Sequence, residues 1–211
     1  MSQAPSALLL IATGCQHCPS VLLSLSELIK EGKLSSLEVV NIVAAPERAQ
    51  ALNVRSVPWV KIGEFELVGL KSRAELEKWI DKSSGPGDMS EYFEELMTSG
   101  EIAKVQEMIK QQPEQIQSLF NIMQSDSSSL SARIGVGAII EELAGSDILL
   151  NQVEQLGTFC QHKNARVRND ACYYLGLSHH PSARKYIEPL LDDENAEVRE
   201  CASDALAEIN H

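Results

Sequence analysis

The first eighty residues combine the two hydrophobic periodicities that distinguish strands from helices. Residues 6–12, SALLLIA, form a short continuous apolar run, which is typical of a buried strand. Apolar residues then recur at helical spacing from Val21 to Ile29, and Gly32 ends that predicted helix. Residues 37–44, LEVVNIVA, predict a second strand. The pattern therefore begins with a strand–helix–strand unit.

The pattern continues with a short helix, a hairpin and a final helix. Residues 46–52 predict a short helix, which Pro46 opens because proline is well tolerated at the first helical position. The segments VPWVKIG and EFELVG predict two strands joined near Gly63, and residues 71–80 predict an amphipathic helix. The predicted order is β-α-β-α-β-β-α. Since the first strands alternate with helices, we expect them to pair in parallel.

The character of the sequence changes after this segment. Residues 83–88, SSGPGD, contain no apolar side chain and predict a linker. Beyond them the pattern is that of successive helices with short breaks and no strand. We therefore expect an α/β domain over residues 1–82, a linker over residues 83–88 and an all-α domain over residues 89–211.

The helical part repeats itself. The dipeptide Val167-Arg168 lies thirty-one residues before Val198-Arg199, and Ala132-Arg133 lies thirty-five residues before Val167-Arg168. Periods of this size indicate a helical solenoid. The polar turn in LLDDENAEVR resembles the turn of HEAT repeats, and this resemblance implies an all-α, HEAT-type solenoid of stacked helix pairs. The expected pairs are 114–124 with 128–144, 148–160 with 164–177, and 182–191 with 195–209, with helices near 89–98 and 101–111 at the start.

The distribution of charge supports two domains and narrows the partners. Residues 1–87 contain nine Lys or Arg and nine Asp or Glu, whereas residues 88–211 contain nine and twenty-one, so the net charge of −12 lies in the second part. An acidic domain is repelled by phosphate backbones, so we expect no nucleic-acid partner. No apolar run approaches the roughly 20 residues that span a bilayer, so we expect no membrane segment.

Five cysteines cannot form a closed set of disulfides. Three of them, Cys160, Cys172 and Cys201, are scattered through the acidic half. We expect Cys172 to pack in the core and Cys160 and Cys201 to pack there or to be partly exposed bystanders, with redox regulation as the alternative. Free buried cysteines are common in reducing compartments, which favours a cytoplasmic location.

The remaining two cysteines, Cys15 and Cys18, form a CxxC motif between the first strand and the first helix. A CxxC motif serves dithiol redox chemistry, metal binding or neither. A helix N-terminus favours a thiolate, so Cys15, which we expect to open the helix, is the candidate nucleophile. Cys18, one turn further, is the candidate resolving thiol. A protonated His17 would stabilise the Cys15 thiolate, and the alternative for His17 is a solvent-facing bystander.

A second motif, RSVPWV at residues 55–60, changes the interpretation of the first. Together with CxxC and LVGLKSRAELEKWI, it resembles the thioredoxin family within the thioredoxin and glutaredoxin superfamily, over roughly residues 6–81. The resemblance implies a thioredoxin-like fold with a cis peptide bond between Val57 and Pro58. It also implies that the Val57 backbone binds an extended substrate and that Gly69 lies near the substrate groove. We expect Trp59 to line this groove or to pack in the core, and not to be catalytic.

The resemblance implies that a redox-active Cys15–Cys18 disulfide is the working group, with no metal and no other cofactor. Two positions depart from the family. Gly14 stands where thioredoxins carry an aromatic residue, and Leu9 stands in place of their buried acid. Proton transfer from Cys18 would therefore need another base or water. The glycines and acids of glutaredoxins are replaced by VGLKSR, which disfavours glutathione binding.

We therefore expect a thiol–disulfide oxidoreductase whose helical domain recruits a protein substrate or redox partner. The first alternative is a protein-interaction scaffold with a redox-sensing or structural thioredoxin fold. The second is a copper carrier, because TGCQHC also resembles the loop of small domains in which two thiolates hold Cu(I). Pro58 disfavours the copper carrier.

Overall fold

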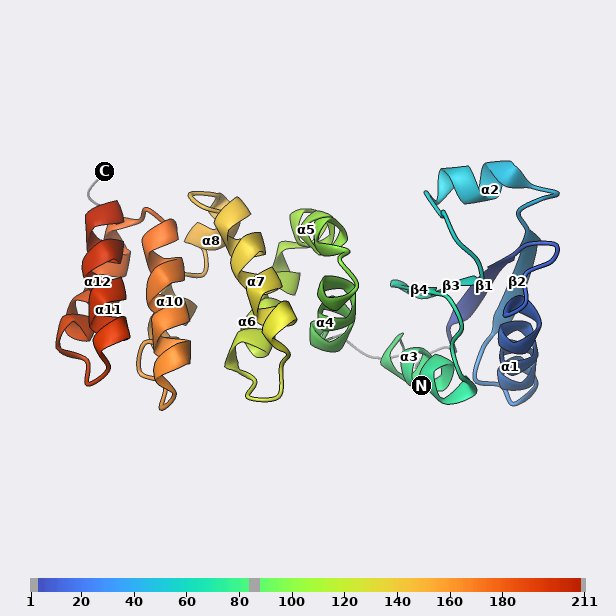
Figure 1. Cartoon of the computed structure of the whole chain (residues 1–211), viewed down its shortest axis with the longest axis horizontal. Helices are drawn as coiled ribbons and strands as arrows, with labels where there is room; N and C mark the ends of the chain where they lie inside the picture. The colour runs from blue at the N-terminus through green and yellow to red at the C-terminus, as the bar shows by residue number, and fades with distance from the viewer. Residues whose placement is uncertain (1–3, 84–87, 210–211) are drawn as a thin grey trace. The chain divides into compact units, whose positions relative to one another are not determined.

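The computed structural model describes residues 4–83 and 88–209, and the chain divides into two compact units, Met1–Gly87 and Asp88–His211 (Figure 1). Most of the expected linker, residues 84–87, lies outside the described residues. The first unit combines a sheet with helices, and the second is built from helices. No helix in the described part of the chain is both long and apolar enough to cross a membrane.

The first unit contains a mixed four-stranded sheet in the order β2-β1-β3-β4. Strand β1 pairs in parallel with β2, as the alternating pattern predicts, and β3 runs antiparallel to both β1 and β4. Leu9 and Leu10 of the central strand β1 are fully buried. The strands are β1 (Ser6–Ile11), β2 (Ser36–Asn41), β3 (Trp59–Ile62) and β4 (Phe65–Val68).

Strand β2 ends earlier than the apolar pattern predicts. The sequence predicts a strand to residue 44, whereas the structure ends it at Asn41. The side-chain oxygen of Asn41 accepts a hydrogen bond from the backbone N–H of Val43 at 3.0 Å. This local bond turns the chain and takes the place of ladder pairing.

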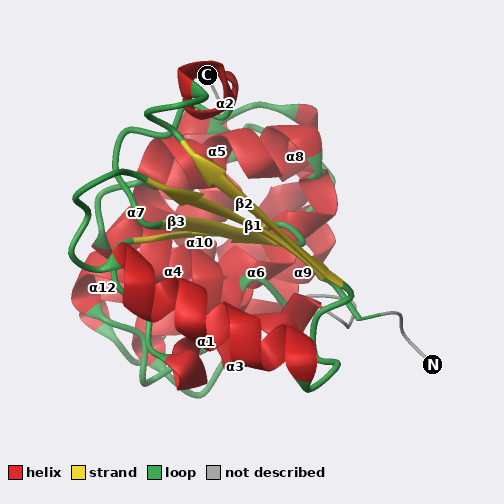
Figure 2. Ribbon diagram, turned by 90° about the vertical axis from the view of Figure 1, so that its right-hand side faces the viewer, coloured by secondary structure: helices red, strands yellow, loops and turns green. Residues whose placement is uncertain are grey.

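Three helices complete this unit: α1 (Cys18–Lys30), α2 (Pro46–Ala51) and α3 (Arg73–Ser83). Helices α1 and α3 lie side by side against one face of the sheet (Figures 1 and 2). Val21, Leu25 and Leu28 form the buried face of α1, at the spacing that predicted the helix. Trp79 of α3 packs on Phe65 of β4 with ring centroids 4.8 Å apart. The expected β-α-β-α-β-β-α order is present.

The second unit follows the predicted succession of helices, with two differences. The predicted helix at 148–160 is split in two after α8, where Asn151, a poor residue for a helix interior, follows the last helical residue. The predicted helix at 182–191 is broken into short pieces, because Pro189 has no N–H to donate. The α-helices are α4 (Ser90–Thr98), α5 (Ile102–Gln111), α6 (Ile116–Gln124), α7 (Leu130–Glu142), α8 (Asp147–Leu150), α9 (Val153–Phe159), α10 (Ala165–Leu177), α11 (Arg184–Ile187) and α12 (Ala196–Ile209). The 3₁₀ helices are η1 (Pro113–Gln115), η2 (Pro181–Ala183) and η3 (Glu188–Asp192).

The three long helices α7, α10 and α12 begin in the same way. A polar side chain just before each helix accepts a hydrogen bond from a backbone N–H of the first turn, and these caps are Ser129, Asn164 and Asn195. Such caps satisfy N–H groups that have no acceptor within the helix. The cap positions are spaced like the sequence repeat.

An arginine four residues after each cap returns to the turn that precedes its own helix. In each case Nη1 donates to a backbone carbonyl oxygen of that turn. The contacts join Arg133 to Ser128 (3.2 Å), Arg168 to His162 (2.9 Å) and Arg199 to Asp193 (2.6 Å). The repeated sequence therefore forms a repeated contact.

Arg168 also ties its helix to the following turn. Its Nε and Nη2 donate to the two carboxylate oxygens of Asp193, both at 2.7 Å, and both side chains are largely buried. The hydrogen bonds from Arg168 lower the pKa of Asp193. Since Arg168 lies in α10 and Asp193 lies in the turn before α12, this ion pair links two successive repeats.

The change Asp193→Asn tests this link. We expect the variant to lose about 1–3 kcal/mol of stability at pH 7, because the guanidinium keeps only a weaker partner. A carboxylate with a lowered folded-state pKa contributes stability above its unfolded pKa, near 4, and this contribution is lost as the pH falls through the folded-state pKa. Urea unfolding followed by circular dichroism between pH 3 and 7 should show a smaller acid-side loss in the variant. The exposed neighbour Asp192, changed to Asn, is the control, and equal pH slopes for all three proteins would contradict the link.

Helices α10 and α12 approach each other closely at Gly176. A Cβ atom added there would lie 2.9 Å from Cβ and 3.1 Å from Cα of Ala205. We expect Gly176→Ala to destabilise the helical unit by about 1–3 kcal/mol, because neither atom can move away without separating the helices. Gly137→Ala in α7 is the matched control, since its nearest neighbour is 3.8 Å away and the change should stabilise the helix by about 0.5–1 kcal/mol. Thermal unfolding measures both, and equal effects of the two changes would refute the close packing.

Candidate functional site

A tight turn leads from β1 to the two cysteines. The backbone N–H of Cys15 donates to the carbonyl oxygen of Ala12 at 3.2 Å, and Gly14 has φ +82°. A positive φ at the third position of such a turn requires glycine. The turn therefore explains why Gly14 stands in place of the family's aromatic residue.

Cys15 and Cys18 form a disulfide, with their Cα atoms 5.5 Å apart. Helix α1 begins at Cys18, so Cys15 lies in the loop before the helix rather than opening it as predicted. The backbone N–H of Cys18 nevertheless points at Sγ of Cys15 over 3.2 Å. An N–H at a helix start stabilises a thiolate, so this contact favours Cys15 as the nucleophile of the reduced protein. Cys15 is partly exposed, whereas Cys18 is 3% exposed.

The Val57-Pro58 segment lies beside Cys15. The peptide bond between Val57 and Pro58, for which the resemblance implies the cis form, is cis. Sγ of Cys15 lies 3.9 Å from the carbonyl oxygen of Val57. The backbone N–H of Gly69 donates to the carbonyl oxygen of Pro58 at 2.8 Å. Three predicted groove residues, Val57, Pro58 and Gly69, are thus brought together with Cys15.

Other predicted site residues lie elsewhere. Trp59 is 3% exposed in β3, so of its two expected places, the groove and the core, its side chain occupies the core. His17 is the N-cap residue of α1, and its exposed side chain makes no capping hydrogen bond. Leu9 is fully buried in β1 and supplies no acid or base.

Sequence reasoning missed one contact that supports the loop. The side-chain amide of Asn41 donates to the hydroxyl oxygen of Thr13 at 3.2 Å. Because β1 and β2 are parallel and Ile11 pairs with Asn41, the end of β2 lies next to the loop that carries Cys15. In the sequence, the polar residue Asn41 in an otherwise apolar strand segment was the feature that could have indicated this contact.

Sequence reasoning also missed two exposed apolar side chains. Val68 and Leu70 flank Gly69 and are 50% and 52% exposed. Gly69 is hydrogen-bonded to Pro58, so these side chains adjoin the cis-proline segment. They offer apolar surface beside the cis-proline segment.

Comparison with protein families matches residues 7–81 to the family described as "Thioredoxin domain". A search of curated proteins found no match to this chain. The matched range runs from β1 into α3 and includes the disulfide and the cis-proline. The first unit is therefore a thioredoxin-like domain with a CxxC disulfide. Within residues 4–83 and 88–209, no three His, Cys, Asp or Glu side chains are grouped so as to hold a metal ion.

The burial difference between the two cysteines predicts their order of reaction. After reduction of the full chain, a short pulse of iodoacetamide should alkylate Cys15 before Cys18, because Cys15 is the more exposed thiol and faces a helix N–H. Peptide mass spectrometry at increasing pulse lengths measures the order. The fully buried Cys172 is an internal reference for protection. Equal labelling of Cys15 and Cys18 at every time point would show that the assigned roles are wrong.

Proposed function

We propose that this protein is a thiol–disulfide oxidoreductase in which Cys15 is the nucleophile and Cys18 the resolving thiol. The observation that carries the proposal is the position of Sγ of Cys15, partly exposed, 3.2 Å from the backbone nitrogen of Cys18 and 3.9 Å from the Val57 carbonyl oxygen. A substrate disulfide can approach only the exposed sulfur, and the buried sulfur lies next to it.

The reduced protein carries out two exchange steps. The Cys15 thiolate attacks one sulfur of a substrate disulfide, and the first substrate thiolate leaves. The Cys18 thiolate then attacks Sγ of Cys15, which closes the disulfide and releases the second substrate thiolate. Since Leu9 cannot accept a proton, the proton of Cys18 leaves through water or through a group of the substrate. The reverse sequence oxidises a substrate dithiol.

The substrate in this proposal is an extended protein segment. The backbone of Val57 offers polar groups next to the cysteines, as in the family that the domain resembles. Val68 and Leu70 add exposed apolar contact beside Gly69. The working group is the Cys15–Cys18 disulfide, and the activity needs no further cofactor.

The helical unit has a recruiting role in this proposal. Caps and arginines that recur with the sequence period support a HEAT-type repeat module, and stacked helix pairs offer extended surfaces for protein partners. A partner bound there would meet Cys15 at raised local concentration. The three free cysteines of this unit favour a reducing compartment, so the proposed location is the cytoplasm.

Reduction of insulin by dithiothreitol tests the activity. We expect the wild-type protein to accelerate insulin precipitation and Cys15→Ser to abolish the acceleration, because no other thiol of the domain is exposed to attack. Cys160→Ser is the matched control and should retain full activity, since Cys160 is buried outside the domain. Equal rates of insulin precipitation with the wild type and with Cys15→Ser would contradict the oxidoreductase proposal and favour the scaffold hypothesis.

The variant Cys18→Ala identifies the partner. Without the resolving thiol, a substrate should stay covalently bound to Cys15 and be released by reductant. The double variant Cys15→Ser, Cys18→Ala is the control for non-specific capture.

A further inference from the structure

A second pair of thiols lies in the helical unit, between α10 and α12. Cys172 of α10 is fully buried, whereas Cys201 of α12 is partly exposed. The two thiols share a hydrogen bond. Sγ of Cys201 also lies 3.5 Å from the carbonyl oxygen of Asn169, which precedes Cys172 by one helical turn. The pair thus spans the interface of two neighbouring helices.

The packing of these helices brings the pair within bonding reach. Gly176 and Ala205 each lie four residues beyond one of the two cysteines, so they form the next layer of the same interface. Only glycine at position 176 allows the two backbones to come this close. The hydrogen bond between the two thiols places their sulfur atoms next to each other in this interface.

The two thiols differ in reactivity. The hydrogen bond from Cys172 lowers the pKa of Cys201, although burial and the carboxylates of Asp204 and Asp170 act against it. The same hydrogen bond and burial raise the pKa of Cys172. Cys160, the third free cysteine, is buried, and its pKa is raised to about 12. Cys201 is therefore the thiol of this unit whose pKa is lowered, and it is also the one that is partly exposed.

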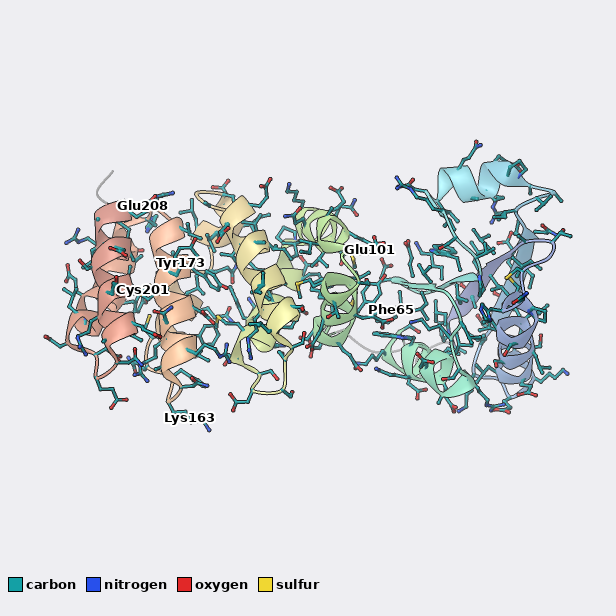
Figure 3. All side chains as sticks on the ribbon, in the orientation of Figure 1. Phe65, Glu101, Lys163, Tyr173, Cys201 and Glu208 are labelled. Carbon is teal, nitrogen blue, oxygen red and sulfur yellow. A yellow bond between two sulfur atoms is a disulfide. The ribbon has the colours of Figure 1, made fainter. Side chains whose placement is uncertain are left out.

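Cys201 opens onto a cavity of about 560 Å³ between α10 and α12. Tyr173 of α10 and Cys201 and Glu208 of α12 belong to its lining and are labelled in Figure 3. The residues that the structure shows around this cavity include no Lys, Arg or His. They do include five carboxylates, Asp170, Glu197, Glu200, Asp204 and Glu208. Asp170 is paired with Arg166, so the four carboxylates of α12 give the cavity its negative charge.

We propose that Cys201 and Cys172 form a second thiol–disulfide exchange site, and that its substrate is a positively charged disulfide. A cysteine flanked by lysine or arginine in a basic protein segment would carry such a disulfide. The carboxylates attract a cationic disulfide to the cavity and repel an anionic one. The site repeats the division found at Cys15 and Cys18, where one sulfur is partly exposed and the other is buried.

The exchange balances without a further reactant. The Cys201 thiolate attacks one sulfur of the substrate disulfide, and the first substrate thiolate leaves and takes a proton from water. Cys172 then attacks Sγ of Cys201 and gives its proton to the second departing thiolate. Two electrons pass from the cysteine pair to the substrate. The products are a Cys172–Cys201 disulfide and two substrate thiols.

The test uses the reduced full chain with Cys15→Ser and Cys18→Ser, so that the first site cannot contribute. The probes are cystamine, which is cationic, bis(2-hydroxyethyl) disulfide, which is neutral, and 3,3′-dithiodipropionate, which is anionic. Each rate is divided by the rate of the same probe with N-acetylcysteinamide, a neutral thiol. At low salt we expect a normalised preference of about 10-fold or more for cystamine over dithiodipropionate. High salt should reduce this preference, because it screens the carboxylates.

Variants separate the thiol chemistry from the charge effect. Peptide mapping should show a Cys172–Cys201 disulfide, and the added change Cys172→Ala should stop the reaction at a mixed disulfide on Cys201. The changes Glu200→Gln and Asp204→Asn should each reduce the preference for cystamine, while Cys160→Ser should leave it unchanged. Circular dichroism confirms that each variant remains folded, and the charge variants keep the test valid if Cys172→Ala does not fold.

Three results would overturn the proposal. They are an unmodified Cys201, equal normalised rates for the three probes, and a mixed disulfide that persists while Cys172 is present. None of them bears on Cys15 and Cys18, which are serine in the tested variant, so the second site and the proposed function stand or fall separately.

Discussion

The candidate site depends on the pairing of one buried strand, β1, with its two neighbours. Antiparallel pairing places Leu10 opposite Trp59, so Pro58 lies beside the end of β1 where the chain turns toward Cys15. Parallel pairing with β2 brings Asn41 to the same end. Because Leu9 and Leu10 point to opposite faces of the sheet and are both fully buried, β1 is held in place by packing on both faces as well as by its two ladders. Segments some forty residues apart meet at the cysteines for this reason.

The departures from the thioredoxin pattern have a consistent physical basis. Gly14 adopts a positive φ that an aromatic residue would adopt only with strain. The conformation of the turn therefore also accounts for the absence of the aromatic residue. Leu9 fills the core of β1 where the family has an acid, and the domain thereby avoids the cost of a buried carboxyl group. In the proposed exchange, this replacement leaves proton transfer at Cys18 to water or substrate. The domain thus has the two sulfurs adjacent and a leucine at the position of the family's acid.

The helical unit uses short polar contacts to connect its repeats. Caps and arginines hold each long helix to the turn before it, and the Arg168–Asp193 ion pair joins one repeat to the next. The interface between α10 and α12 includes the close approach of Gly176 to Ala205 and the pair of thiols. Each unit thus contains a cysteine pair with one partly exposed and one buried sulfur. In the first unit the pair lies at a strand–helix turn, and in the second it lies at a contact between two helices.

The sequence alone determined the order of the elements, because strand and helix periodicities are local properties, and it located CxxC and the Val57-Pro58 segment. It also revealed the arginine repeat, which the structure turns into a repeated contact. Local patterns did not predict that α1 starts at Cys18 or that β2 ends at Asn41, and they left open whether Trp59 is buried, because these outcomes depend on hydrogen bonds and packing between elements. Only the tertiary structure brought Cys172 and Cys201 together, since the distance between two helices is set by the side chains at their interface, and neither helix by itself encodes it.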